Sequence, residues 1–337
     1  MSKKPQKETI IRIIAIVATL LVFGAAVAAV IKMVTSKQAE PTGTSYTNPT
    51  SQNQTYTYNG KDYILKEDIE TILLMGIDDY ENDFIGANGK FINDSQADVL
   101  YVFVIDHKNK TYQTIQLNRD TMTNVSMLSD TGKDAGSAVM QLALAHAYGR
   151  DDRARCRNTV DAVSELLFDM DIDHFISLTL ESIDVLNDQV GGVTVTIPKD
   201  MTAADPEFTQ GATVTLKGSQ AEKFVRSRMS LPDDTNEFRM ERQQQFLTNW
   251  KIKAMEKLES DSNFGLSLVL SLSNYMESDM SANELSGFAS QLSDYEDKGV
   301  VTTKGTTTEG ELFREYKIDL DDLEGKVVDI FYDEVTN

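Results

Sequence analysis

The chain has 337 residues, of which 41% are hydrophobic, and a formal net charge of −21 at pH 7. This length allows one large domain or two, and the hydrophobic content is that of a globular protein. The acidity excludes a sequence-independent nucleic-acid binder, whose surface is basic, so no nucleic-acid partner is expected. The single cysteine, Cys156, excludes an intrachain disulfide.

An apolar segment near the N-terminus predicts a membrane anchor. Residues 13–31 are 19 consecutive uncharged residues, enough for a helix to cross the ~30 Å hydrocarbon core of a bilayer. Basic residues precede them, which places the N-terminus in the cytoplasm and the following chain outside. We predict a cytoplasmic tail at 1–12, a single-pass anchor in the cell membrane at 13–34, a flexible polar linker at 35–60, and an extracytoplasmic domain over 61–337. A cleaved signal peptide is the competing interpretation, although its apolar region is usually ~7–15 residues long.

Three stretches rich in β-branched and aromatic residues predict strands at 72–77, 99–105 and 111–117. Turn residues at Asp106 and Asn109 join the last two in a predicted hairpin.

Charged side chains stand at the ends of these three predicted strands. Asp78 follows the first strand, Asp98 opens the second, and Arg119 and Asp120 follow the third. If those strand ends share one edge of a sheet, carboxylates and an arginine meet there.

Strand and helix patterns alternate along the rest of the chain. Predicted strands lie at 175–180, 193–197 and 300–303, and predicted helices at 137–148, 159–168, 181–189, 219–225, 238–257, 263–276, 282–294 and 320–332. Ser281 and Glu284 form a capping box at the start of one of these helices. The alternation predicts an α/β (α+β) fold with a mixed central β-sheet covered by helices.

The stretch at 224–246 concentrates positive charge in this acidic chain, with Arg226, Arg228, Arg239 and Arg242. A guanidinium is forked and always charged, so it suits phosphate or carboxylate oxygens. Spacing alone leaves two interpretations open: a site for a polyanion, or a solvated helix start whose arginines pair with neighbouring acids.

Several segments together resemble the LytR-CpsA-Psr family of bacterial cell-envelope proteins. They are LLMGID at 73–78, ADVLYVFVID at 97–106, QLNRDT at 116–121, AHAYG at 145–149, IDHFISL at 172–178, QVGGVTVTIP at 189–198, FVRSR at 224–228 and EFRMERQQQF at 237–246. The resemblance rests on the order of these segments along the chain. A lone pair of arginines would not be enough to indicate the family.

The resemblance implies a phosphotransferase assisted by Mg²⁺ (or Mn²⁺). Such an enzyme moves an anionic glycopolymer, such as wall teichoic acid or capsular polysaccharide, from a polyprenyl-pyrophosphate lipid carrier in the membrane to peptidoglycan. Breaking a pyrophosphate bond needs positioning and neutralisation of the developing charge more than covalent chemistry. The lipid-linked glycopolymer, peptidoglycan and the membrane are therefore the expected partners.

The family's site residues carry over to matching positions. Asp78 and Asp98 correspond to the metal-coordinating carboxylates, and Asp98, Arg119 and Asp120 form the expected catalytic set. The expected pyrophosphate-binding residues are Arg119, Arg226, Arg228, Arg239 and Gln243. Mg²⁺ prefers oxygen ligands and often needs only one or two protein carboxylates.

Some positions depart from the family pattern. Asp79-Tyr80 and Gln96 stand where an arginine is frequent. The resemblance also implies an apolar tunnel for the lipid, lined here by the predicted helices at 137–148 and 159–168 and by Phe103.

One residue's role and two alternative functions stay open at this stage. His146 lies in an apolar pattern that favours a packing role over a base. A lipid pyrophosphatase would use the same residues with water as the acceptor. A non-catalytic binder of polyprenyl phosphate would keep the arginines and have no need of the carboxylate pair at Asp78 and Asp98.

Overall fold

The computed structural model describes residues 55–78, 90, 92–227, 231, 235–261, 264–272, 274–281, 284, 295–310 and 313–336. These residues form two compact units, each described by itself below. We call residues 55–177, 277–279 and 296–336 the sheet unit, and residues 178–276 and 280–295 the helical unit. The predicted domain at 61–337 therefore contains two compact units.

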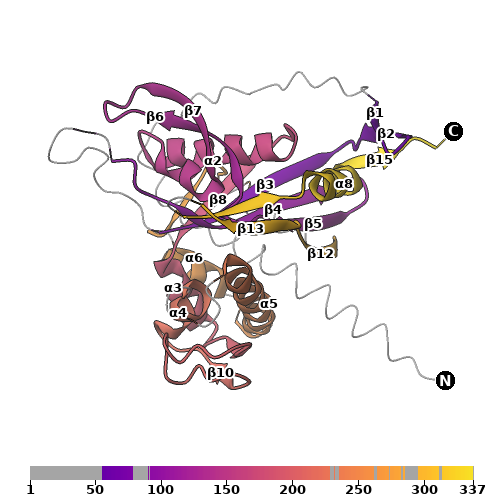
Figure 1. Cartoon of the computed structure of the whole chain (residues 1–337). Helices are drawn as coiled ribbons and strands as arrows, with labels where there is room; N and C mark the ends of the chain where they lie inside the picture. Colours follow the sequence, from indigo (N-terminus) through magenta and orange to yellow (C-terminus); the bar gives the residue numbers. More distant parts are fainter. Residues whose placement is uncertain are drawn as a thin grey trace, which may run out of the picture. The chain divides into compact units, whose positions relative to one another are not determined.

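A six-stranded mixed sheet, in the order β11-β8-β3-β4-β5-β12, is the centre of the fold (Figure 1). β3, β4 and β5 pair antiparallel, which confirms the predicted hairpin, and β12 runs parallel to β5. The strands are β3 Ile69–Ile77, β4 Ala97–Asp106, β5 Thr111–Gln116, β8 His174–Thr179, β11 Met276–Ser278 and β12 Glu296–Thr302. The mixed central sheet predicted from sequence is confirmed.

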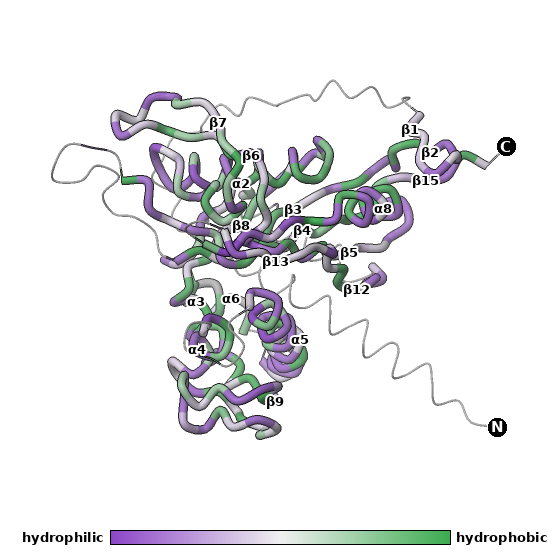
Figure 2. Tube along the Cα trace, viewed as in Figure 1, coloured by the Kyte–Doolittle hydropathy of each residue, from purple (hydrophilic) through white to green (hydrophobic). Residues whose placement is uncertain are grey.

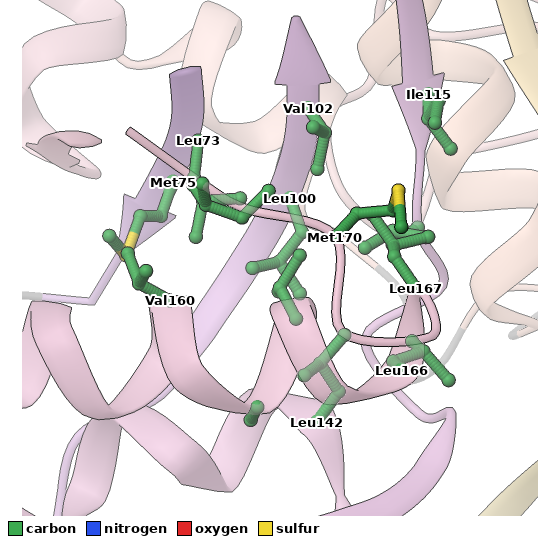
Figure 3. Packing of buried hydrophobic residues seen from close by; sticks show 14 of the residues in the cluster. Leu73, Met75, Leu100, Val102, Ile115, Leu142, Val160, Leu166, Leu167 and Met170 are labelled. Carbon is green, nitrogen blue, oxygen red and sulfur yellow. The ribbon is translucent and has the colours of Figure 1, made fainter. Parts of the chain in front are cut away.

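One face of this sheet packs on α2 (Asp152–Leu166). Figure 3 shows the packing of strand side chains against this helix and the turn after it. The strands contribute Leu73, Met75, Leu100 and Val102, and the helix contributes Val160. All four sheet residues have at most 1% of their surface exposed. Burial of this apolar surface is the main stabilising term for the sheet unit.

The predicted helix at 137–148 is wrong. Residues Asp134–Gln141 form strand β7, which pairs antiparallel with β6 (Met122–Leu128), and Leu142–Ala147 form a short 3-10 turn, η2. Val139 is 67% exposed, so the apolar spacing that suggested a helix belongs to a hairpin with a largely solvent-facing strand. The lipid-tunnel helix expected at this position is therefore absent from the described chain.

A small sheet, β1-β2-β15, joins the two ends of the sheet unit. Its strands are β1 Tyr56–Tyr58, β2 Lys61–Leu65 and β15 Tyr332–Glu334. The predicted linker at 35–60 is thus wrong in its last residues, which form β1. The final helix, α8 (Leu320–Phe331), begins at the capping residue Asp319 and confirms the prediction for the C-terminus.

The helical unit consists of four helices and a short hairpin among the residues described. They are α3 Glu181–Gln189, α4 Gln220–Arg226, α5 Asn236–Ser260, α6 Phe264–Leu272, β9 Thr194–Thr196 and β10 Thr213–Thr215. Hydrophilic and hydrophobic segments alternate along α5 in Figure 2, as an amphipathic helix requires. Trp250 of α5 is 2% exposed and donates its indole N–H to the carbonyl of Leu186 at 2.6 Å.

Three other predictions have mixed outcomes. The helix predicted at 263–276 ends at Leu272. The capping box is confirmed, because Ser281 N–H donates to Glu284 at 2.6 Å and Glu284 N–H donates to the Ser281 hydroxyl at 3.3 Å. The helix predicted at 282–294 otherwise lies outside the described residues.

The predicted tail at 1–12, the anchor at 13–34 and the linker as far as residue 54 also lie outside the described residues. Within the part of the chain that is described, no helix combines the length and apolar character needed to cross a bilayer.

Candidate active site

Strand register places three of the predicted site residues at one end of the central sheet. The end of β3 pairs with the start of β4 through Ile77 and Ala97, so Asp78 and Asp98 lie at the same edge. β5 runs antiparallel to β4 and ends toward that same edge, which carries Arg119 there. The shared sheet edge expected from sequence is confirmed.

A β-bulge sets the position of Asp98. Gly76 pairs with Val99 and Ile77 with Ala97, so Asp98 is an extra residue in β4 with no partner in the ladder. Bulges redirect side chains and are frequent beside active sites. A Cβ atom on Gly76 would lie 3.0 Å from the Cβ of Val99, so glycine permits the close approach of the two strands here.

Arg119 is the centre of the site. Its guanidinium forms a buried ion pair with Asp98 and donates from Nη2 to the side-chain carbonyl of Gln96. Its Nε lies 3.3 Å from Oδ1 of Asp120. Asp98 and Arg119 are each 8% exposed, so their charges meet where solvent screens them little. A forked cation between two carboxylates is thereby fixed in orientation.

Asp120 orients Arg119 from the protein side. It is only 2% exposed, and its Oδ1 accepts a hydrogen bond from Nε2 of Gln141 at 2.8 Å. Its own N–H donates to Oδ1 of Asn118 at 2.9 Å. These contacts make Asp120 a positioning residue for the arginine.

The C-terminal hairpin supports the same segment. This hairpin comprises β13 (Gly305–Glu309) and β14 (Arg314–Ile318). The amide of Gln141 donates to the carbonyl of Arg314 at 2.8 Å, and the N–H of Tyr316 donates to the carbonyl of Asp120 at 2.8 Å. Residues near the end of the chain thus hold the Arg119-Asp120 pair in place.

The segment that leads into β4 is clamped by buried polar groups. Arg155, fully buried in α2, donates to the carbonyl of Ile92 at 2.7 Å. Nδ1 of His146 lies 2.9 Å from the hydroxyl of Ser95. These contacts fix the backbone immediately before Gln96, and therefore the contact that Gln96 makes with the central arginine.

His146 has a packing role, as the sequence favoured. The side chain has no exposed surface, and burial, helped by the charge of Arg155, lowers its pKa to about 3. The imidazole is therefore neutral at physiological pH. Cys156, 3.6 Å from Nε2 of His146, has its pKa raised by burial, which leaves the thiol unreactive.

The residues at the sheet edge include ligand types that a hard divalent cation prefers. Asp78 and Asp98 offer carboxylate oxygens, the ligands that Mg²⁺ prefers. Among the described residues, no group of three or more His, Cys, Asp or Glu side chains is arranged to hold a metal. Two carboxylates suit an ion that completes its shell with water and substrate phosphate, rather than one held by a full protein cage.

The predicted pyrophosphate-binding residues of the helical unit have local partners. Arg226, half-exposed at the end of α4, pairs with Glu222 at 2.8 Å. Arg239 is 3% exposed, and its Nη2 lies 2.5 Å from the side-chain oxygen of Asn236. Gln243 donates to the carbonyl of Val225 at 3.5 Å, which ties α5 to α4. Arg228 lies outside the described residues.

Arg242 differs from the other arginines of this stretch. It is fully buried, and its guanidinium donates to the backbone carbonyls of Phe224 and Ser227 at the end of α4. Its Nε donates to the carbonyl of Phe238 at 3.3 Å. Unsatisfied carbonyls at a helix C-terminus need such donors, so Arg242 is structural.

Two contact residues escaped the sequence-based prediction of the site. Gln96 stands where the resemblance led us to expect an arginine. That departure from the family pattern was the only feature of the sequence that drew attention to this position. Gln141 lay inside a segment predicted as a helix, so nothing in the sequence pointed to its contact with Asp120.

Fold and site together define an α+β protein whose sheet edge presents a fixed arginine between carboxylates. The chain belongs to the LytR_cpsA_psr family, whose model matches residues 31–324.

The chain is similar to several known proteins. Biofilm regulatory protein A of Streptococcus mutans is 28% identical over 218 residues, which cover 62% of this chain and 49% of that protein. The polyisoprenyl-teichoic acid–peptidoglycan teichoic acid transferase TagU of Bacillus cereus is 26% identical over 202 residues, covering 60% of this chain and 58% of that protein. The chain thus spans about half the length of the curated relatives it matches.

Among solved structures, TagT bound to LIIa-WTA matches 79% of this chain and 91% of its own, with 21% identity and a TM-score of 0.56; TagT is a Bacillus subtilis protein. This likeness shows the shared fold.

Proposed function

We propose that this protein is a glycopolymer–peptidoglycan phosphotransferase. It takes an anionic glycopolymer, such as wall teichoic acid or capsular polysaccharide, from a polyprenyl-pyrophosphate carrier and attaches it to peptidoglycan. The observation that carries the proposal is Arg119, buried and oriented by Asp98, Gln96 and Asp120 at the edge of the central sheet.

The names of its relatives support the substrate class. TagU is described as transferring teichoic acid from a polyisoprenyl carrier to peptidoglycan, and TagT has been captured with LIIa-WTA. Membership of the same family makes an anionic, lipid-linked polymer the substrate that best fits the arginine-rich motifs of this chain.

The reaction we propose is a displacement at phosphorus. The acceptor hydroxyl of peptidoglycan forms a bond to the phosphorus on the polymer side, and the bond from that phosphorus to the bridging oxygen breaks. The lipid leaves as its monophosphate, and the hydroxyl proton passes to a carboxylate. Arg119 neutralises the negative charge that develops on the phosphate oxygens.

The carboxylates divide these tasks by burial. Asp120 is held by Gln141 and is almost inaccessible, so it keeps Arg119 in position. Asp78 is half-buried at the end of β3, and together with Asp98 it would hold Mg²⁺ (or Mn²⁺), which supplies further neutralisation of the phosphates when bound. Asp78 and Asp98 are the two candidates for receiving the proton.

The helical unit contributes further anion-binding side chains in this proposal, three arginines and one glutamine. Arg226, Arg228, Arg239 and Gln243 bind the pyrophosphate and the polymer's own anionic groups. Their match to the family motif supports this assignment, as does the concentration of arginines in one stretch of a chain whose formal net charge is −21.

We also propose the location of the reaction. The apolar segment at 13–34, of which residues 13–31 are uncharged, anchors the protein in the cell membrane with its N-terminus in the cytoplasm, and the remaining chain acts on the outer face. A lipid-linked donor and a wall acceptor meet there.

The test uses the full-length chain in lipid nanodiscs with a synthetic polyprenyl-pyrophosphoryl oligosaccharide and Mg²⁺, with and without peptidoglycan fragments. The account predicts that sugar appears on the peptidoglycan through a phosphodiester, and that Arg119→Ala abolishes this transfer. Equal turnover without an acceptor would instead show a pyrophosphatase. Saturable lipid binding with no turnover by the wild-type protein would show a non-catalytic binder.

A further inference from the structure

A concave site lies in the sheet unit, and none of the residues that line it is assigned to transfer. It is a cavity of about 480 Å³ between the end of α2, the turn that follows it, α8 and the strands β1 and β15. Pockets of 300–1,000 Å³ are typical of sites for small molecules or side chains. None of the residues that line it takes part in the Arg119 site, so its role is a separate question.

Aromatic rings form much of its wall. Tyr56 and Tyr332 lie with their ring centroids 5.6 Å apart and their planes at 34°. Phe168, on the same wall, is 41% exposed. Its backbone, like that of Asp169, is in the left-handed region, with φ of 59° and 60°. Two consecutive non-glycine residues in this region form the turn that ends α2.

The charge of the lining has one sign. Asp169, Asp171 and Glu324 contribute carboxylates, and no Lys, Arg or His is among the described residues that line the cavity. The phenol of Tyr56 donates a hydrogen bond to Glu324. That bond, with burial, raises the pKa of Tyr56 to about 12, so the ring stays a neutral donor and the glutamate is held in one orientation.

Aromatic faces and carboxylates together select organic cations. A ring attracts a cation through its quadrupole, and a carboxylate accepts its N–H donors. The remaining wall includes Met170, Val327 and Val328, which offer apolar contact to the methylenes of a side chain. A simple metal ion would leave this apolar surface unused, and an anion would be repelled by three carboxylates.

We infer that this cavity binds an aliphatic primary ammonium group, of the kind carried by a lysine side chain in a peptide. The alkyl stem lies along the valines and the methionine, and the ammonium lies among the aromatic rings and the carboxylates. This binding site goes beyond the proposed transfer reaction and does not depend on it.

The test is a ligand-observed NMR titration of the full-length protein with Nα-acetyl-lysine amide. Nα-acetyl-norleucine amide, which has the same stem without the ammonium, is the matched ligand. The lysine derivative is expected to bind saturably, and the norleucine derivative at least about tenfold more weakly, since a hydrogen bond to a charged group contributes about 1.5–3 kcal/mol.

Two variants locate the site. Glu324→Gln keeps the shape of the side chain and an acceptor for Tyr56, so folding is preserved, and affinity should fall about tenfold. Asp169→Asn, at an exposed position, should weaken binding about threefold. The matched control is Asp329→Asn, which removes an exposed carboxylate of the same helix α8 outside the lining and should leave affinity unchanged.

Four results would overturn the inference. Equal affinity for the two ligands would show that the ammonium is not recognised. Wild-type affinity in Glu324→Gln would show that the ammonium does not bind at this carboxylate. A loss in Asp329→Asn equal to that in Glu324→Gln would show general attraction to an acidic surface. No saturable binding of the lysine derivative to the wild-type protein would remove the site altogether.

Discussion

Arg119→Met measures most directly how much the buried ion pairs of the site contribute to the free energy of unfolding. Methionine keeps a long unbranched side chain of similar reach but has no charge and no donors. Asp98 and Asp120, which are 8% and 2% exposed, then lose the cation that neutralises them. Breaking a buried ion pair by removing one partner costs about 3–5 kcal/mol, because the other charge stays buried and uncompensated.

Arg153→Met supplies the matched control in the same unit. Arg153 is 53% exposed and lies 3.8 Å from Glu277. An exposed pair of this kind contributes about 0–1 kcal/mol. The two substitutions change the same residue type to the same residue, so the difference of about 3 kcal/mol or more between them reports the buried ion-pair environment of Arg119 and not the change of side chain itself.

The assay is urea unfolding at neutral pH, followed by circular dichroism and extrapolated to water. Arg119→Lys should lie between the wild type and Arg119→Met, because it keeps the charge but loses the fork that reaches Asp98 and Gln96 together. The reasoning fails if the free energy of unfolding of Arg119→Met lies within about 1 kcal/mol of the wild-type value, or is no lower than that of Arg153→Met. Either result would show that the ion pair is not buried as described.

Two further predictions concern a close backbone approach and a histidine. Gly192→Ala should destabilise the protein by at least about 1 kcal/mol more than Gly211→Ala, by urea unfolding. Both glycines have positive φ, but only at Gly192 would the new Cβ meet another atom closely, 2.5 Å from the carbonyl oxygen of Leu216; equal losses would refute the clash. The carboxylate of Asp279, as the hydrogen-bond acceptor for the imidazole, raises the pKa of His174 above its ordinary value of 6.5. Its contribution to the free energy of unfolding is therefore complete below pH 6.5 and is lost as the pH rises through the raised value. His174→Gln should flatten that decline between pH 6 and 9, and an unchanged slope would contradict the assignment.

Local patterns in the sequence were sufficient for the strands that carry the site. β3, β4 and β5 are continuous apolar runs bounded by turn residues, and the charged residues at their ends are visible as such. Hairpin pairing of neighbouring strands then brings Asp78, Asp98 and Arg119 to one edge with no further information.

Long-range contacts were not predictable from the same patterns. The bulge at Asp98 depends on how Gly76 meets Val99 across two strands. Gln141 reaches Asp120 from a strand that the apolar spacing presented as a helix, because an exposed hairpin lacks the burial that normally reveals period-2 alternation. The supporting hairpin β13–β14 lies almost 200 residues further along the chain from the arginine that it holds in place.

The arginines of the helical unit illustrate a second limit. Sequence spacing treats Arg239 and Arg242 alike, three residues apart on one helix. In the structure the guanidinium of Arg242 donates its hydrogen bonds to backbone carbonyls at the end of α4. The family motif leaves Arg242 out of the expected binding set, and tertiary packing supplies the physical reason that spacing lacks.

The measurement that tests the central claim most directly is transfer of labelled oligosaccharide to peptidoglycan by Asp98→Asn, compared with Asp106→Asn. Both residues are buried carboxylates of β4, at 8% and 6% exposure, but Asp106 lies at the opposite end and binds Asn109 in the turn. The account predicts that Asp98→Asn loses at least about 100-fold in rate, on the scale of removing one electrostatic group from an active site, while Asp106→Asn retains wild-type turnover. Equal rates for the two variants would contradict the assignment of the active site to this edge of the sheet.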